Sequence, residues 1–269
     1  FTNNPIWVAC VMTKYLHKVL PPQYSHVNKV YCLLAATVFC ALPLCSTEAA
    51  AENILKYDGT TNIHGNAKTW AAKNEYDGID IRVTGVDGGY YTDTTEALVL
   101  NNQTLNVKGK GKFVSIINTA QNKQIDNNGG IYAKGGSTVN FTDVDSIYIA
   151  AIAGKEGGND STVISAKDPG RDFKGYTNIV NISGNTVQLI GSIDVMHSLG
   201  SVFFNRNARH TVNAALSGSD SFWYGSAIGE TDERTTVNLS LADGATWIFN
   251  AGKSTLNAGG IIRNLKLDK

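Results

Sequence analysis

The chain has 269 residues and a formal net charge of zero, and only 17% of its residues are charged. A neutral chain of this kind gives no electrostatic case for nucleic acid or an anionic membrane as a partner. Its composition changes near residue 51, because all four cysteines lie before that point and all 27 glycines lie after it. The sequence therefore divides into a short leader and a longer, glycine-rich part without cysteine.

The leader contains an apolar run of 16 residues, VYCLLAATVFCALPLC, at positions 30–45. Asn28-Lys29 precedes the run, and small residues occupy positions 49–51. A basic start, a short apolar stretch and a small-residue site are the parts of a secretory signal peptide. A membrane anchor is the weaker alternative, since the run is shorter than the roughly 20 residues that cross a bilayer comfortably and Pro43 interrupts it.

We therefore predict a signal-peptide helix in residues 27–51, cleaved between Ala51 and Glu52. Residues 1–26 open with Phe1 rather than Met, and we predict that they are a non-native or unstructured leader. The remaining chain is then exported across the inner membrane, to the cell surface, the outer membrane or the extracellular space.

The exported part, residues 52–269, is close to neutral. Three of the 23 Lys and Arg residues and one of the 23 Asp and Glu residues lie before it, which leaves 20 basic and 22 acidic residues. Because it has no cysteine, no disulfide can stabilise it, and its stability must come from burial and backbone pairing. Its length is enough to bury a substantial core.

Short strand patterns separated by Gly, Asn, Asp and Ser turns fill the exported part, and they share a Thr-aliphatic-Asn theme. The four copies begin at Thr104, Thr138, Thr211 and Thr236, and residues 179–181 form a looser copy. Successive asparagines of the theme are 34, 41, 32 and 25 residues apart. Apolar residues alternate around each copy, which places one set on a buried face and the other toward solvent.

A shared strand theme with uneven spacing favours an all-β fold of the β-solenoid class, in which each coil keeps its strands and varies its turns. Asparagine and threonine could then stack in hydrogen-bonded ladders along the coils. The alternative is a β-sandwich or jelly roll whose strands resemble one another by chance. We predict solenoid coils in residues 104–269, and an N-terminal cap or the first coils in residues 52–103.

The C-terminal segment, residues 235–269, carries a more specific pattern: a strand, then Asp-Gly-Ala-Thr-Trp, then Ser-Thr-Leu-Asn, then an apolar strand. The residues that carry it are Val237, Leu239, Asp243, Gly244, Ala245, Trp247, Ser254, Leu256, Asn257 and Leu265. This pattern resembles the repeating unit of bacterial autotransporter passenger domains, with weaker echoes back to about Thr104. The resemblance implies a right-handed parallel β-helix that passes through the outer membrane by means of a C-terminal β-barrel.

The resemblance also implies an adhesin or another extracellular interaction protein. Its partners would be a glycan or protein on a host or neighbouring cell, together with the outer-membrane translocation machinery, and not nucleic acid. The chain reaches Lys269 one strand after the Trp motif, without room for a barrel. We therefore expect the sequence to be the N-terminal portion of a longer passenger.

The residue patterns predict no enzyme, and no catalytic, cofactor-binding or metal site. The alternative function is a secreted β-helix enzyme acting on polysaccharide as a lyase or glycoside hydrolase, which would need acidic groups and a basic partner on one face. The only residues that could plausibly form such a cluster are Asp143, Asp145, Asp168, Arg171 and Asp172. A third alternative is a structural surface-layer component.

Two aromatic clusters are the best candidates for ligand contacts. Phe222, Trp223 and Tyr224 are adjacent on a predicted strand, so at least one ring is expected to point outward. Tyr90 and Tyr91 lie beside a Gly-Gly turn. Exposed aromatic rings stack on sugar faces and anchor protein contacts, although covering the edge of a coil is the more ordinary role for such rings.

Five Asn-x-Ser/Thr sequons begin at Asn102, Asn140, Asn159, Asn181 and Asn238. In a bacterial chain rich in Asn and Thr, we expect such sequons from composition alone and assign them no role in glycosylation.

Overall fold

The computed structural model describes residues 53–59, 63–65, 74–84, 96–119, 129–152, 161–167, 175–195, 207–229, 234–250, 262 and 264–268. Contacts divide the chain into residues 1–50 and 51–269, and every described residue belongs to the second unit. The predicted leader, signal peptide and cleavage site lie outside the described residues. Within the described part there is no helix that is long and apolar enough to cross a membrane.

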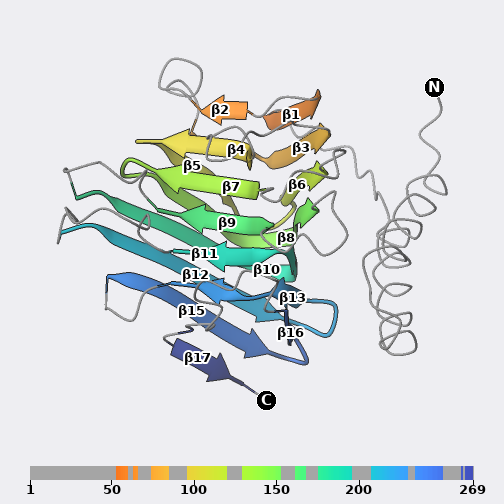
Figure 1. Cartoon of the computed structure of the whole chain (residues 1–269). Helices are drawn as coiled ribbons and strands as arrows, with labels where there is room; N and C mark the ends of the chain where they lie inside the picture. Colours follow the sequence, from red (N-terminus) through yellow and green to blue (C-terminus); the bar gives the residue numbers. More distant parts are fainter. Residues whose placement is uncertain are drawn as a thin grey trace. The chain divides into compact units, whose positions relative to one another are not determined.

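The strands β1 to β17 pair in parallel and form three stacks, which we call the first, second and third stack (Figure 1). The first stack contains β1 (Ile54–Gly59), β3 (Gly78–Thr84), β6 (Phe113–Thr119), β13 (Phe222–Gly225), β16 (Thr246–Phe249) and the second halves of β8 (Thr138–Ile152) and β10 (Thr177–Ile190).

The second stack is a separate six-stranded sheet. It contains β2 (Ile63–Gly65), β4 (Glu96–Asn101), β7 (Gly129–Lys134), β9 (Thr162–Ala166), β11 (Ser192–Asp194) and β14 (Ala227–Ile228). The third stack contains β5 (Thr104–Lys108), the first halves of β8 and β10, β12 (Arg209–Ser217), β15 (Thr235–Ala242) and β17 (Asn264–Leu267).

The chain visits the first, second and third stacks in turn and then begins the next coil. Strands β3, β4 and β5 make one such coil, and β13, β14 and β15 make a later one. Figure 1 shows the coils following one another from β1 and β2 at one end to β17 at the other. This is the parallel, stacked arrangement of a β-solenoid, and for the described residues the prediction of an all-β fold of that kind is confirmed.

Two long strands turn the corner between the third and first stacks without a break in strand structure. The first half of β8 pairs with β5 and its second half with β6. Between the halves, Asp143 has a φ of 57°. In β10 the register shifts between Ile182 and Gly184. A local extra residue bends a strand and strengthens its twist. These irregularities therefore allow one strand to pair in both the third and the first stack.

The core runs along the axis of the solenoid, because alternate side chains of each strand point inward and stack on those of the next coil. One inward column joins Ile81, Ile116, Ile149, Leu189, Trp223 and Trp247, which follow one another in strand register. The first five of these side chains are fully buried. Each coil therefore buries its apolar face against its two neighbours rather than by itself.

A second column, of asparagines, runs along the outward side of the third stack. Its members, in strand register, are Asn106, Asn140, Asn181, Asn213, Asn238 and Asn264. Each Nδ2 donates to the Oδ1 of the preceding asparagine, over distances of 2.7 to 2.8 Å. The spacings of the Thr-aliphatic-Asn theme are thus the numbers of residues per coil, and the expected asparagine ladder is present.

The ladder should contribute measurably to stability. Replacing Asn213 with leucine removes two side-chain hydrogen bonds, one to Asn181 and one from Asn238. At about 1 kcal/mol each, their loss should lower the free energy of unfolding by about 2 kcal/mol, measured by urea denaturation. As a control, Ala215→Leu changes an outward, exposed position on the same strand and should cost less than about 0.5 kcal/mol. Equal losses in the two variants would show that the ladder contributes nothing.

Candidate functional site

The aromatic cluster on β13 divides between the inside and the outside of the solenoid. Trp223 points inward and is fully buried. Its ring stacks on Trp247 at a centroid distance of 5.2 Å, and its Nε1 donates to the backbone oxygen of Gly191 at 2.9 Å. The prediction of Trp223 as a ligand contact was therefore wrong, because strand alternation places this ring in the core.

Phe222 and Tyr224 flank Trp223 and point outward, where both are half-buried. In register, Tyr224 lies between Ile190 and Ile248, and Asn250 donates a 3.1 Å hydrogen bond to its hydroxyl. The outward side of the first stack is thus apolar and aromatic near its C-terminal end. Tyr90 and Tyr91, the other predicted contact residues, lie outside the described residues.

Tyr148 belongs to the same outward surface but was missed by the sequence reasoning, because it stands alone on its strand. It occupies the column that continues through Gln188 to Phe222. Burial raises the pKa of the Tyr148 phenol to about 12. The fold therefore holds this side chain in its neutral form well beyond the pH at which an exposed tyrosine ionises.

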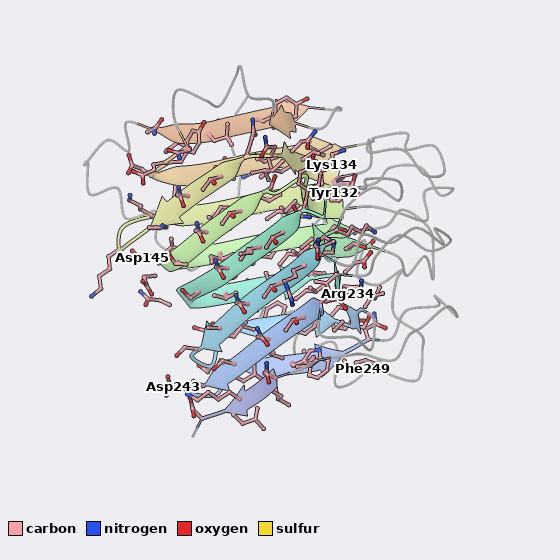
Figure 2. The ribbon with its side chains drawn as sticks, turned by 90° about the vertical axis from the view of Figure 1, so that its left-hand side faces the viewer. Tyr132, Lys134, Asp145, Arg234, Asp243 and Phe249 are labelled. Carbon is pink, nitrogen blue, oxygen red and sulfur yellow. The ribbon has the colours of Figure 1, made fainter. Side chains whose placement is uncertain are left out.

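An enzyme would need clustered acidic residues. Those that the structure describes, Asp143 and Asp145, instead form hydrogen bonds at the corners of the solenoid. Asp145 accepts hydrogen bonds from the Gly111 backbone N–H at 3.0 Å and from Asn185 Nδ2 at 3.3 Å. The backbone N–H of Asp143 donates to Ser183 Oγ at 3.1 Å. Asp243 makes a similar contact in a later coil, where it accepts a 2.7 Å hydrogen bond from Ser217 Oγ. Figure 2 shows Asp145 and Asp243 along the same edge of the ribbon.

The other three residues of the predicted enzyme cluster, Asp168, Arg171 and Asp172, lie outside the described residues. Within the part of the chain that the structure describes, no group of three or more His, Cys, Asp or Glu side chains could hold a metal ion. His210, one of three histidines in residues 52–269, is fully buried, and its Nδ1 lies 3.1 Å from Asn178 Nδ2. It therefore joins neighbouring coils at a corner.

A charged cluster lies on the outward side of the second stack, on the edge where Figure 2 labels Tyr132 and Lys134. Lys167 forms an ion pair with Asp194, which is 6% exposed. Burial acts to lower the pKa of Lys167, but the attraction of Asp194, their hydrogen bond and the charge of Glu96 outweigh it and raise this pKa. Beside this pair, the Lys134 ammonium lies 5.2 Å from the centroid of the Tyr132 ring.

The third stack carries a shallow groove that sequence reasoning did not identify. A hollow of about 310 Å³ follows the asparagine ladder, and a second of about 480 Å³ follows the corner toward the first stack. Both are lined by Ser183, Ala215 and Ser240, which are neighbours in strand register. The two hollows share these residues and together form one groove along the solenoid, which we call the ladder groove.

The sequence did contain a sign of this groove. Three of the five sequons, those beginning at Asn140, Asn181 and Asn238, contribute both their Asn and their Ser or Thr to the outward side of the third stack. Residues two apart on a strand face the same side. The sequon pattern is therefore the outward half of the repeated strand, and it marks the surface that carries the groove.

No family model, curated protein or solved structure matches this chain. The geometry of the chain itself must therefore support any assignment of function.

The half-buried Tyr148 predicts a specific pH dependence. Because the pKa of Tyr148 is raised from about 10 in the unfolded chain, its contribution to stability is fully present below about pH 10 and is lost as the pH rises toward 12. The Tyr148→Phe variant cannot ionise at this position. Its free energy of unfolding should therefore fall less steeply than that of the unmodified chain over this pH range, measured by urea denaturation. Identical pH profiles would mean that Tyr148 ionises normally in the folded chain.

Proposed function

We propose that this chain is part of an exported, autotransporter-like passenger that acts at the cell surface in adhesion or another extracellular interaction. Its coils would form a right-handed β-helix, and residues 27–51 would be the signal peptide that directs it across the inner membrane. The passenger would have no catalytic activity. Its role would be to present contact surfaces away from the cell.

The single observation that carries the proposal is the continuous outward surface of the third stack. Strands β5 to β17 of this stack repeat the same polar positions along the axis, and Asn106 and Asn264 mark the first and last rung of the ladder. A repeated surface can offer the same contact several times. Many weak contacts made together give a much stronger attachment than any one of them, which suits an adhesive protein.

The fold also supports a route through the outer membrane. Each coil bonds only to its neighbours, so a coil can fold as it emerges, with the preceding coil as its template. The exported part has no cysteine, and therefore no disulfide can close a loop before translocation. Both properties are useful for a chain that crosses a narrow pore in an extended form.

The export step can be tested directly. Expression of the full chain in a bacterium with an outer membrane should yield a mature protein that begins at Glu52, identified by N-terminal sequencing. A variant with Leu34→Arg and Val38→Arg in the apolar run should reduce export by at least about tenfold, because buried arginines disfavour membrane insertion. Retention of residues 27–51 on the exported protein would contradict the signal-peptide assignment.

Adhesion is tested separately with purified chain coated on polystyrene beads. The coated beads should remain on cultured epithelial cells or on bacterial lawns after washing, in numbers at least about tenfold above beads coated with the heat-unfolded chain. Equal retention of the two bead types on every surface would contradict a role in adhesion. Regular self-association of the beads would instead favour the surface-layer alternative.

A further inference from the structure

We propose that the ladder groove binds a neutral, linear polysaccharide chain that lies along the axis of the solenoid. This inference rests on the proposed adhesive function and names the surface and the class of ligand that would carry it. It follows from three properties of the groove: the hydrogen-bonding groups left over by the ladder, their spacing, and the charge of the lining.

The first property is unused hydrogen-bonding capacity. An asparagine side chain has two N–H donors and an oxygen with two acceptor positions. In Asn181, Asn213 and Asn238 the ladder uses one N–H and one acceptor position of each amide. One donor and one acceptor position of each amide remain, and these three side chains line the groove.

The ladder also fixes how these amides are oriented. Each Nδ2 must face the preceding Oδ1, so a flipped amide would place two oxygens or two N–H groups together. The remaining donors are therefore held in one direction before any ligand arrives. Side chains that are already ordered lose little entropy on binding, which favours affinity.

The second property is spacing. Neighbouring coils are separated by about 4.8 Å, the distance between hydrogen-bonded strands, so the groove repeats the same polar groups at this interval. Ser183 and Ser240 add hydroxyls beside the asparagines, and Ala215 between them leaves the groove open. A ligand that matches this surface repeats its own hydroxyls at a similar interval, as the sugar units of an extended linear glycan do.

The third property is the near absence of charge among the described residues that line the hollow along the ladder. Its residues are asparagine, serine, threonine, alanine, isoleucine and leucine, apart from Lys266 at one end. Lys266 itself forms a 2.6 Å ion pair with Asp268. The lining of the second hollow includes one basic residue, Lys110, and one acidic residue, Asp143, so their charges balance. A sulfated or phosphorylated chain would require unpaired cations along the groove, so a neutral glycan is the better match.

A bound glycan of this kind would be held by several hydrogen bonds without an aromatic platform, because none of the described residues that line the groove is aromatic. Each hydrogen bond exchanged with water contributes only about 1 kcal/mol. We therefore expect weak binding by a single chain, in the micromolar to millimolar range, and much stronger attachment when many copies act together.

The test uses the full chain immobilised on a biosensor and a set of linear neutral oligosaccharides: cellohexaose, xylohexaose, mannohexaose and a β-1,4-galactan fragment. Heparin serves as the polyanionic comparison. The key variant is Ala215→Trp, which fills the groove at an exposed position shared by both hollows. The matched control is Thr246→Trp, which adds the same ring at an exposed position on the outward side of the first stack.

At least one neutral oligosaccharide should bind the unmodified chain, and Ala215→Trp should weaken that binding by at least about tenfold while Thr246→Trp leaves it unchanged. Circular dichroism establishes that each variant folds. If Ala215→Trp does not, Ser240→Tyr on β15 narrows the same groove and should weaken binding in the same manner.

Three outcomes would overturn the inference. Binding of no neutral oligosaccharide would exclude this ligand class, and preferential, salt-sensitive binding of heparin would indicate a polyanion instead. Equal weakening by both tryptophan variants would place the glycan site outside the groove. None of these outcomes bears on the result of the bead-adhesion assay. If the beads adhere through a protein receptor, the proposed function stands although the glycan inference fails.

Discussion

The structure depends on the register between neighbouring coils, and the asparagine ladder is the interaction that marks that register. Backbone pairing alone would accept a coil shifted by one residue, but such a shift would turn every inward side chain outward. A shifted asparagine would also lose its partner above and its partner below. Because each amide both donates and accepts along the column, one wrongly placed coil would cost two hydrogen bonds at once.

The same register builds the inside and the outside of the solenoid together. Where Trp223 stacks on Trp247 in the core, Tyr224 is placed beside Ile248 on the outside. Where Asn213 continues the ladder, Ala215 opens the groove two residues later. A stack of similar strands therefore produces continuous outward surfaces without any need for a separate binding domain. Near its C-terminal end the first stack offers an apolar and aromatic surface, and the third stack offers a nearly uncharged one.

Much of this architecture could be predicted from the sequence, because the relevant pattern is local. Alternation along five or so residues is visible in strands of the third stack such as β12 and β15, and the spacing of the repeated asparagine equals the number of residues per coil. The ladder extends one rung beyond the repeated theme, to Asn264, which no threonine precedes two residues earlier. That rung could not be found from the motif, since its position is fixed by its neighbour Asn238 and not by its own sequence context.

The functional surfaces were harder to predict, because they depend on which residues of different coils become neighbours. Three adjacent aromatics on a strand suggested a contact site, yet the middle ring, Trp223, belongs to the core. The ladder groove needs Ser183, Ala215 and Ser240 side by side, and these residues are separated by whole coils in the sequence. Only the register between strands brings them together.

The most direct measurement of this register is disulfide cross-linking across β12 and β15, in a chain whose four native cysteines are replaced by serine. The pair Ala215→Cys and Ser240→Cys lies in register on the same outward side, at about the 4.8 Å strand spacing that a disulfide can bridge. It should oxidise readily. The pair Ala215→Cys and Ala242→Cys, shifted by two residues, should remain reduced. Cross-linking of the shifted pair in preference to the first would contradict the register on which the ladder, the core and the groove all depend.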